Sequence, residues 1–125
     1  MLEWCDWMAF QTMYQELIDG GSIVAMAIID TTTGNITWTT DNWAIDSHAI
    51  MQSWAQRAPS LVVQGVKYST LQVLEDRFIG TSIKGHGHFL LAKCPTNFAI
   101  VAWSPSDQEA RGAFTGVARL AATYQ

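Results

Sequence analysis

From Val62 to Trp103 the chain reads VVQGVKYSTLQVLEDRFIGTSIKGHGHFLLAKCPTNFAIVAW. Short apolar runs alternate here with turn-forming residues, and this regular spacing is typical of antiparallel strands joined by hairpins. The expected strands are Val62-Val63, Val66–Leu74, Arg77–Ile83, His88–Lys93 and Asn97–Trp103. The stretch therefore predicts an antiparallel meander.

Two more strands are expected before this meander, at Ser22–Asp30 and Ile36–Thr40, with a turn between them at Thr31–Asn35. The first of them is almost continuously apolar, which predicts a strand that is buried on both faces of the sheet. The second alternates apolar and polar residues, as expected for its hairpin partner.

Three segments repeat their apolar residues at helical spacing: Leu2–Ile18, Ser47–Arg57 and Asp107–Tyr124. Asp46 or Ser47 is expected to cap the second helix, and Ser104-Pro105-Ser106-Asp107 to begin the third. The order helix, two strands, helix, five strands, helix predicts an α+β domain, with helices packed on a central antiparallel sheet. No linker or repeat divides residues 1–125, so we expect a single domain.

The composition is typical of a compact, ordered protein, because 49% of the residues are hydrophobic and only 14% are charged. The longest apolar run, Ile23–Ile29, is too short to cross a membrane, and no basic residue precedes an apolar stretch as in a secretory signal. Cys5 and Cys94 form no CxxC pair and are expected to be free thiols in a reducing, cytoplasmic compartment.

The charges are divided unevenly along the chain. Residues 1–56 carry seven acids and no base, whereas residues 57–125 carry seven bases and four acids. Such asymmetry either serves solubility alone or directs the second half toward an anionic partner. A net charge of −4 with only seven bases makes duplex nucleic acid an unsuitable partner.

Trp4 and Trp7 lie three residues apart at the start of the chain, where side chains are usually poorly packed. Positions i and i+3 share one face of a helix, so the two rings would form an aromatic ledge. This ledge either packs the terminal helices together or forms a docking surface. Trp54 and Trp103 are assigned to the core, and Trp43 is left undecided.

Four patterns together resemble the profilin family over nearly the whole chain. They are the helix start with Trp4 and Trp7, the hairpin strand Gly34-Asn35-Ile36-Thr37-Trp38, the segment Gly65-Val66-Lys67-Tyr68 with the later Phe89–Lys93, and the strand Phe98–Trp103 leading to a final helix that ends in Tyr124. Cys94-Pro95, Ala118 and Arg119 depart from the family pattern, so the chain resembles a divergent member.

The resemblance implies a profilin-like fold, with the N- and C-terminal helices packed together on one face of the sheet and a further helix on the other. It also implies a cytoplasmic, cytoskeleton-associated monomer that binds actin monomers and regulates actin polymerisation. The implied actin-binding residues are Lys67, Ser69, Lys84, Lys93 and Arg111. Binding of anionic phosphoinositides is only weakly supported, because the bases are scattered and lipid recognition usually needs clusters of them.

The resemblance further places Trp4, Trp7, Trp38 and Tyr124 in a groove for proline-rich ligands. Physical chemistry favours the same ligand, since a polyproline II helix is already ordered and loses little entropy on binding. Flat aromatic rings stack on its prolines, while indole N–H and phenol O–H groups donate to its carbonyls.

No other chemistry is indicated as strongly. His86 and His88 form an H-x-H pair, but no third ligand accompanies them, so an exposed turn is expected rather than a metal site. No nucleophile is placed beside a base and no phosphate loop is present, so neither an enzyme nor a cofactor is expected. The alternative function is a roadblock-type scaffold, which serves small GTPases as a dimer and does not need aromatic residues at both termini.

Overall fold

The computed structural model describes the backbone of residues 2–124 and the side chains of residues 9–124. Its helices are α1 (Leu2–Asp19), α2 (Ser47–Ala55) and α3 (Ala110–Thr123). Its strands are β1 (Ala25–Asp30), β2 (Ile36–Thr39), β3 (Ser60–Val63), β4 (Val66–Leu74), β5 (Arg77–Thr81), β6 (His88–Lys93) and β7 (Phe98–Ser104).

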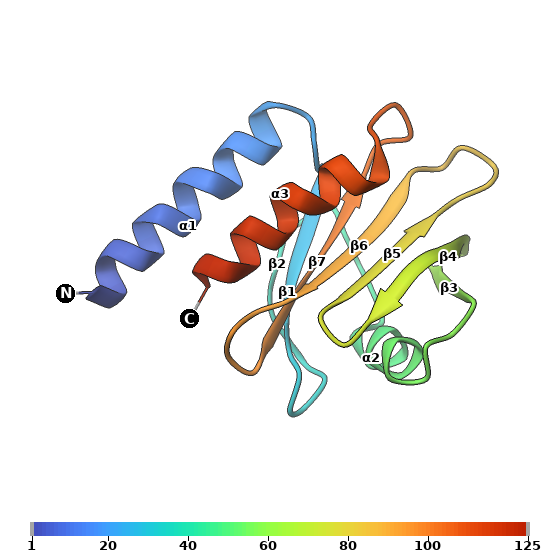
Figure 1. Ribbon diagram of the computed structural model, residues 1–125, viewed down its shortest axis with the longest axis horizontal. Coiled ribbons are helices and arrows are strands. Elements are labelled where there is room, and N and C mark those ends of the chain that lie inside the picture. The colour runs from blue at the N-terminus through green and yellow to red at the C-terminus, as the bar shows by residue number, and fades with distance from the viewer. Residues whose placement is uncertain (1, 125) are drawn as a thin grey trace.

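The strands form one antiparallel sheet in the order β2-β1-β7-β6-β5-β4-β3 (Figure 1). From β3 to β7 each strand pairs with the next one along the chain, so the predicted meander is confirmed. The β1–β2 hairpin then joins the sheet through β1, which pairs along its whole length with β7. As a result, β2 and β3 are the two edges of the sheet.

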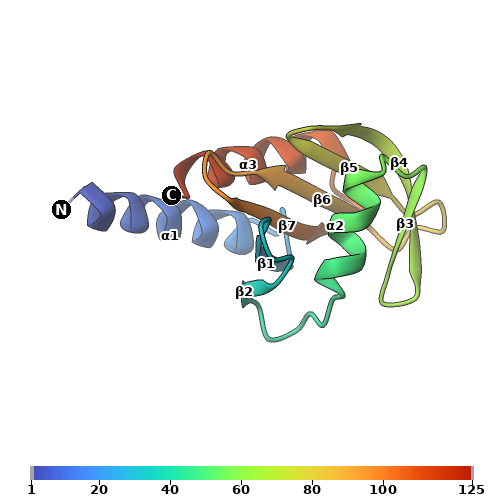
Figure 2. The same cartoon turned by 90° about the horizontal axis from the view of Figure 1, so that it is seen from below.

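The helices cover the two faces of the sheet as expected. Helices α1 and α3 lie side by side on one face, and α2 lies on the other (Figures 1 and 2). Alternate residues of β1 point into the two cores: Met26 and Ile28 face α1 and α3, whereas Ala27 and Ile29 face the α2 side. The prediction that this strand is buried on both faces is therefore correct.

Helix α3 begins at Ala110, three residues later than the sequence predicts. Residues 105–108 form a turn instead, in which the Gln108 amide donates to the Pro105 carbonyl at 3.0 Å. The cap position is Glu109, whose side chain makes no capping hydrogen bond. At α2, by contrast, the Asp46 carboxylate accepts a hydrogen bond from the Ala49 amide, so the cap predicted there is confirmed.

Strand β1 begins at Ala25 instead of Ser22, because the end of α1 occupies the intervening backbone. The amide of Ser22 donates to the Leu17 carbonyl at 3.0 Å, and Gly21 has the positive φ of 74° common after a helix. Hydrogen bonds at the end of α1 thus take the place of the first inter-strand hydrogen bonds expected for this strand.

The assignment of Trp54 and Trp103 to the core holds only in part. Both pack against the α2-side core, but both remain partly exposed. Each indole N–H donates to a carbonyl at the rim, that of Leu74 for Trp54 and that of His86 for Trp103. Trp43, which the sequence leaves undecided, is buried with 7% exposure.

Candidate functional site

An aromatic groove lies between α1 and the edge strand β2. Trp38 of β2 is 42% exposed, and Tyr14 of α1 meets it edge to face with ring centroids 5.5 Å apart. Phe10 and Tyr124 continue the aromatic wall, with centroids 5.2 Å apart. We use the name aromatic groove for the surface formed by these four residues and the two pockets that adjoin them.

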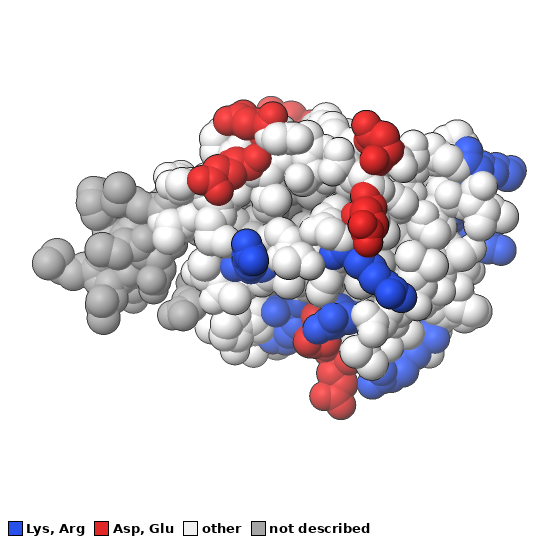
Figure 3. Space-filling view, turned by 45° about the horizontal axis from the view of Figure 1, so that its top comes forward, with Lys and Arg blue, Asp and Glu red and all other residues white. Residues whose placement is uncertain are grey.

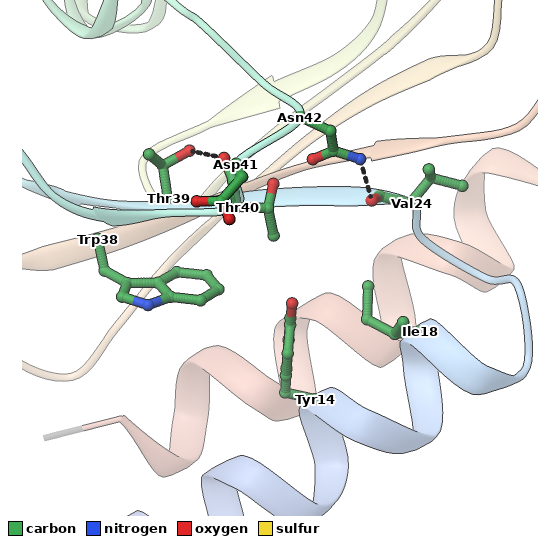
Figure 4. A pocket seen from close by; sticks show the side chains of 8 residues that line it. All are labelled: Tyr14, Ile18, Val24, Trp38, Thr39, Thr40, Asp41 and Asn42. Atoms are coloured by element: carbon green, nitrogen blue, oxygen red, sulfur yellow. Dashed lines mark hydrogen bonds between the residues drawn. The ribbon is translucent and has the colours of Figure 1, made fainter.

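The two pockets share Tyr14 and Trp38, which stand between them. One has a volume of ≈ 320 Å³ and is lined by Phe10, Gln11, Tyr14, Ile28, Thr37, Trp38 and Tyr124. The other has a volume of ≈ 500 Å³ and is lined by Tyr14, Ile18, Val24, Trp38, Thr39, Thr40, Asp41 and Asn42 (Figure 4). The groove therefore continues past the aromatic pair on both sides.

A β-bulge directs Trp38 into this groove. The register between β1 and β2 shifts at Ile28 and Ile29, so Ile28 pairs with Trp38 while Ile29 pairs with Ile36. Residues two apart in a regular strand point to the same face, but the bulge lets Ile36 pack on the α2 side while Trp38 faces α1. The indole is thereby placed opposite Tyr14.

The polar atoms of the aromatic pair are available to a ligand. Within residues 9–124, neither the Trp38 indole N–H nor the Tyr14 hydroxyl forms a hydrogen bond with the protein. Burial raises the pKa of both Tyr14 and Tyr124 above the ordinary phenol value, so both remain protonated donors at neutral pH. Edge-to-face packing on Phe98, at 5.3 Å between centroids, also holds the Tyr124 ring in place.

The structure brings two of the four predicted groove residues into one pocket, namely Trp38 and Tyr124. Positions 4 and 7 belong to α1, but the side chains of Trp4 and Trp7 lie outside the described residues, as does that of Cys5. The prediction missed Phe10 and Tyr14. Tyr14 follows Trp7 by two helical turns, so the i, i+3, i+4 spacing already contained the signal.

A second exposed surface covers β3 and β4 on the face that carries α1 and α3, whereas β5 is covered there, since its Ile79 is buried in the core beneath these helices. These helices cross the other strands and leave this part of the sheet uncovered (Figure 1). Tyr68 and Val73 of β4 pack into the α2-side core, so their neighbours Lys67, Ser69 and Leu74 point to the uncovered face. We call this surface the open sheet face.

Exposed apolar side chains distinguish the open sheet face from an ordinary polar surface. Val62 is 60% exposed and Leu74 43%, and each is the neighbour of a residue that packs into the α2-side core. A second bulge, between Thr70 and Gln72, interrupts the alternation of β4 at Leu71. At this bulge the Leu71 side chain is 48% exposed.

The predicted actin-binding residues divide between the two ends of the sheet. Lys67 and Ser69 lie near the end of β4 that adjoins the turn at residues 82–87, which carries the exposed Lys84. Arg111 is exposed in the first turn of α3. Lys93 lies at the opposite end of β6, where its Nζ donates to the carbonyls of Cys94 and Thr96.

The residues considered for metal or thiol chemistry have structural partners. His88 contacts the Thr81 hydroxyl through Nδ1 and the Gln108 carbonyl through Nε2, at 2.8 and 2.7 Å. Among the described side chains no group of three or more potential metal ligands comes together. Burial raises the pKa of the Cys94 thiol to about 12, so this cysteine is not a reactive nucleophile at neutral pH.

None of the helices in the described part of the chain is both long and apolar enough to cross a membrane. In Figure 3, basic side chains are dispersed between neutral and acidic ones over the visible surface and do not form one continuous patch. The two features that remain as candidate binding surfaces are the aromatic groove and the open sheet face.

Comparison with known proteins identifies relatives with the same architecture, although no protein-family model matches the chain. The sequence is 32% identical over 114 residues to Odin profilin of Odinarchaeota yellowstonii, covering 91% of this chain and 94% of that protein. It is 28% identical over 110 residues to Thor profilin of a Thorarchaeota archaeon, covering 85% of each.

Solved structures agree with the sequence comparison. LokiProfilin2 in its complex with rabbit actin superimposes with a TM-score of 0.75 at 27% identity, covering 89% of this chain and 91% of that one. Acanthamoeba castellanii profilin IB shares the fold, with a TM-score of 0.71 at 19% identity over 85% and 87% of the two chains. By sequence and by structure, this chain belongs to the profilin family.

Proposed function

We propose that this protein binds actin monomers through the open sheet face and thereby regulates actin polymerisation. The observation that carries the proposal is the likeness to LokiProfilin2, which was solved in complex with rabbit actin. An uncovered surface with two exposed aliphatic residues, Val62 and Leu74, and a basic rim supports it, because partner surfaces often combine an apolar centre with a polar edge. We expect the protein to act as a cytoplasmic monomer associated with the cytoskeleton.

Within this surface, Lys67, Ser69, Lys84 and Arg111 are the residues that we expect to contact actin. Lys93 is expected to contribute least, because its ammonium group is already engaged by carbonyls of its own turn. The dispersed bases in Figure 3 support no more than weak phosphoinositide binding. The roadblock-type scaffold is not carried forward, since the chain belongs to the profilin family.

Charge reversal at Lys67 tests the proposed actin surface. We expect Lys67→Glu to weaken binding to actin monomers about tenfold, which corresponds to ~1.4 kcal/mol. Lys93→Glu is the matched control on the same sheet and should change the affinity less than threefold. Affinity is measured from the concentration of each variant needed to keep actin out of the sedimented filaments. A wild-type protein without effect on sedimentation would overturn the proposal.

We further propose that the aromatic groove binds proline-rich peptides. Trp38 and Tyr14 offer flat rings for stacking, and each offers a donor without a protein partner in residues 9–124. A polyproline II ligand needs both kinds of contact, because its carbonyls are exposed and its pyrrolidine rings present apolar faces. Calorimetric titration of the protein with a decaproline peptide tests this proposal. If no heat of binding is measured at millimolar peptide, the groove is removed from the proposed function.

A further inference from the structure

Among the residues that the structure describes, the aromatic groove carries a charge at one end only. Among the residues that line its two pockets, Asp41 is the one charged residue, and neither lysine nor arginine is present. Asp41 lines the larger pocket together with Trp38 and Asn42 (Figure 4). A ligand that fills this pocket therefore meets a carboxylate beside an exposed indole, and no basic side chain.

The Asp41 carboxylate is available for an intermolecular contact. In the part of the chain whose side chains are described, it forms no hydrogen bond and no ion pair. This distinguishes it from Asp30, which caps its own turn by accepting from the Thr32 amide, and from Asp46, which caps α2. Asp41 thus has no role in the local backbone structure that would explain its place in the groove.

The neighbouring side chains present further acceptors at this end. The amide nitrogen of Asn42 donates to the Val24 carbonyl at 3.1 Å, which turns its oxygen away from Val24 (Figure 4). The exposed Trp38 ring lines the same pocket, and an indole face attracts a cation within about 6 Å. A carboxylate, an amide oxygen and an indole face together suit a guanidinium or ammonium group.

The order of the lining residues gives the groove a direction. Along α1, Phe10 lies at the end shared with Tyr124, Tyr14 lies in the middle beside Trp38, and Ile18 lies at the end shared with Asp41. A proline run seated across the central pair would place its next residues over the Asp41 end. A basic residue next to the proline run would then lie at Asp41.

We propose that the aromatic groove selects proline-rich segments that carry an arginine or lysine next to the proline run, with the cation bound at Asp41 and Trp38. This inference rests on the proposed function of the groove and adds a specificity to it. Residues 1–56, which supply α1 and β2, carry seven acids and no base, and this charge is complementary to such a ligand.

The test compares peptides that differ in one residue. Decaproline peptides with blocked ends carry Gly-Arg, Gly-Gln or Gly-Glu after the prolines, and a second set carries the same pairs in mirrored order before them. Calorimetry measures binding at 50 and 500 mM NaCl. We expect one of the two Arg peptides, the one whose orientation brings Arg to Asp41, to bind about three- to tenfold more tightly than the matching Gln peptide. The expected gain is modest because an exposed ion pair and an indole contact each contribute little binding free energy.

Two variants assign the preference to Asp41. Asp41→Asn should remove the advantage of Arg over Gln, and 500 mM salt should reduce this advantage in the wild type. Glu75→Gln is the control: it removes the same charge from the exposed β4–β5 turn, far across the sheet from β2, and should preserve the preference.

The outcomes separate this inference from the function on which it rests. Equal affinity for the Arg and Gln peptides, or a preference that survives Asp41→Asn, would overturn the selection of basic ligands and leave the proline groove standing. If none of the peptides binds, both proposals fail. An Arg preference that Asp41→Asn abolishes and Glu75→Gln retains would establish the site.

Discussion

The position of a tryptophan in the fold determines whether its ring lies in the core or on a candidate binding surface, as Trp43 and Trp38 show. Trp43 has the same side chain but is buried, whereas Trp38 keeps 42% of its surface exposed on an edge strand. The bulge at Ile28 and Ile29 turns it toward α1, where Tyr14 supports one edge of the ring. The ring is thus fixed in position without being covered, as stacking on a ligand requires.

Replacement of this indole should affect binding more than stability. We expect Trp38→Ala to weaken decaproline binding at least tenfold, because the stacking face is lost, while the free energy of unfolding falls by only about 1 kcal/mol. Calorimetry and urea denaturation measure the two effects. Val62→Ala, which truncates an exposed apolar residue on the other surface, is the control and should leave peptide binding intact. Unchanged peptide affinity in Trp38→Ala would contradict the groove.

Because of Cys94, the free energy of unfolding is expected to fall at alkaline pH. Its pKa is raised from 9.0 to about 12 by burial, so the folded state holds the proton more tightly than the unfolded state does. The resulting stability is fully present below pH 9 and is lost as the pH rises from 9 toward 12, because the unfolded thiol ionises first.

Comparison with a variant isolates this effect. Between pH 9 and 10 the wild type should lose stability relative to Cys94→Ala, approaching a slope of ~1.4 kcal/mol per pH unit for one proton. Urea denaturation at several pH values under reducing conditions provides the measurement. Parallel stability curves for the two proteins would show that the thiol is not desolvated in the fold.

At the level of elements, the turn between β5 and β6 depends on close packing against the next strand. Gly87 has a φ of 105°, and a Cβ there would lie 2.6 Å from the Ser104 carbonyl oxygen of β7. Gly85 also has a positive φ, of 80°, but an added Cβ would meet nothing within 4 Å. A side chain at Gly85 would therefore meet only backbone strain, whereas a side chain at Gly87 would meet both strain and a steric clash.

Alanine substitution at these positions should give unequal losses. Gly85→Ala is expected to cost about 1 kcal/mol, the strain of a left-handed conformation. Gly87→Ala should cost at least about 2 kcal/mol more, because overpacking against backbone adds to the strain. Thermal and urea denaturation measure both. Equal losses would mean that β7 does not constrain this turn as the structure indicates.

At the level of the whole molecule, the two candidate surfaces lie toward opposite edges of the sheet. The aromatic groove adjoins β2 and β1, and the open sheet face lies on β3 and β4, with β7, β6 and β5 between them (Figure 1). No residue belongs to both surfaces. A partner on one surface therefore leaves the other accessible.

Simultaneous binding follows from this separation. Saturation with a decaproline peptide should change the affinity for actin monomers less than twofold, as expected for sites that share no contacts. Sedimentation of actin with the protein, with and without peptide, measures this coupling. The Trp38→Ala variant serves as control, since the peptide should occupy its groove at least tenfold more weakly. Competition between peptide and actin would contradict the placement of the two surfaces.

The sequence by itself determined the elements and their class. The bounds of β4 and β6 agree with the prediction, and the meander, the three helices and the Asp46 cap are all present. These features depend on alternation, helical spacing and turn residues, which act over a few neighbouring positions. Of the four aromatic residues predicted to form a groove, Trp38 and Tyr124 line one pocket, and the groove's ligand stays a prediction.

Only the tertiary structure decided how these elements form surfaces. The bulge that turns Trp38, the contact of that ring with Tyr14, and the exposure of Leu71 and Asp41 all depend on which strands and helices become neighbours. Local pattern does not encode these neighbours, because β1 pairs with β7 from the far end of the chain and α1 packs against α3. The chemistry of each side chain was visible in the sequence, whereas long-range packing determined which side chains meet.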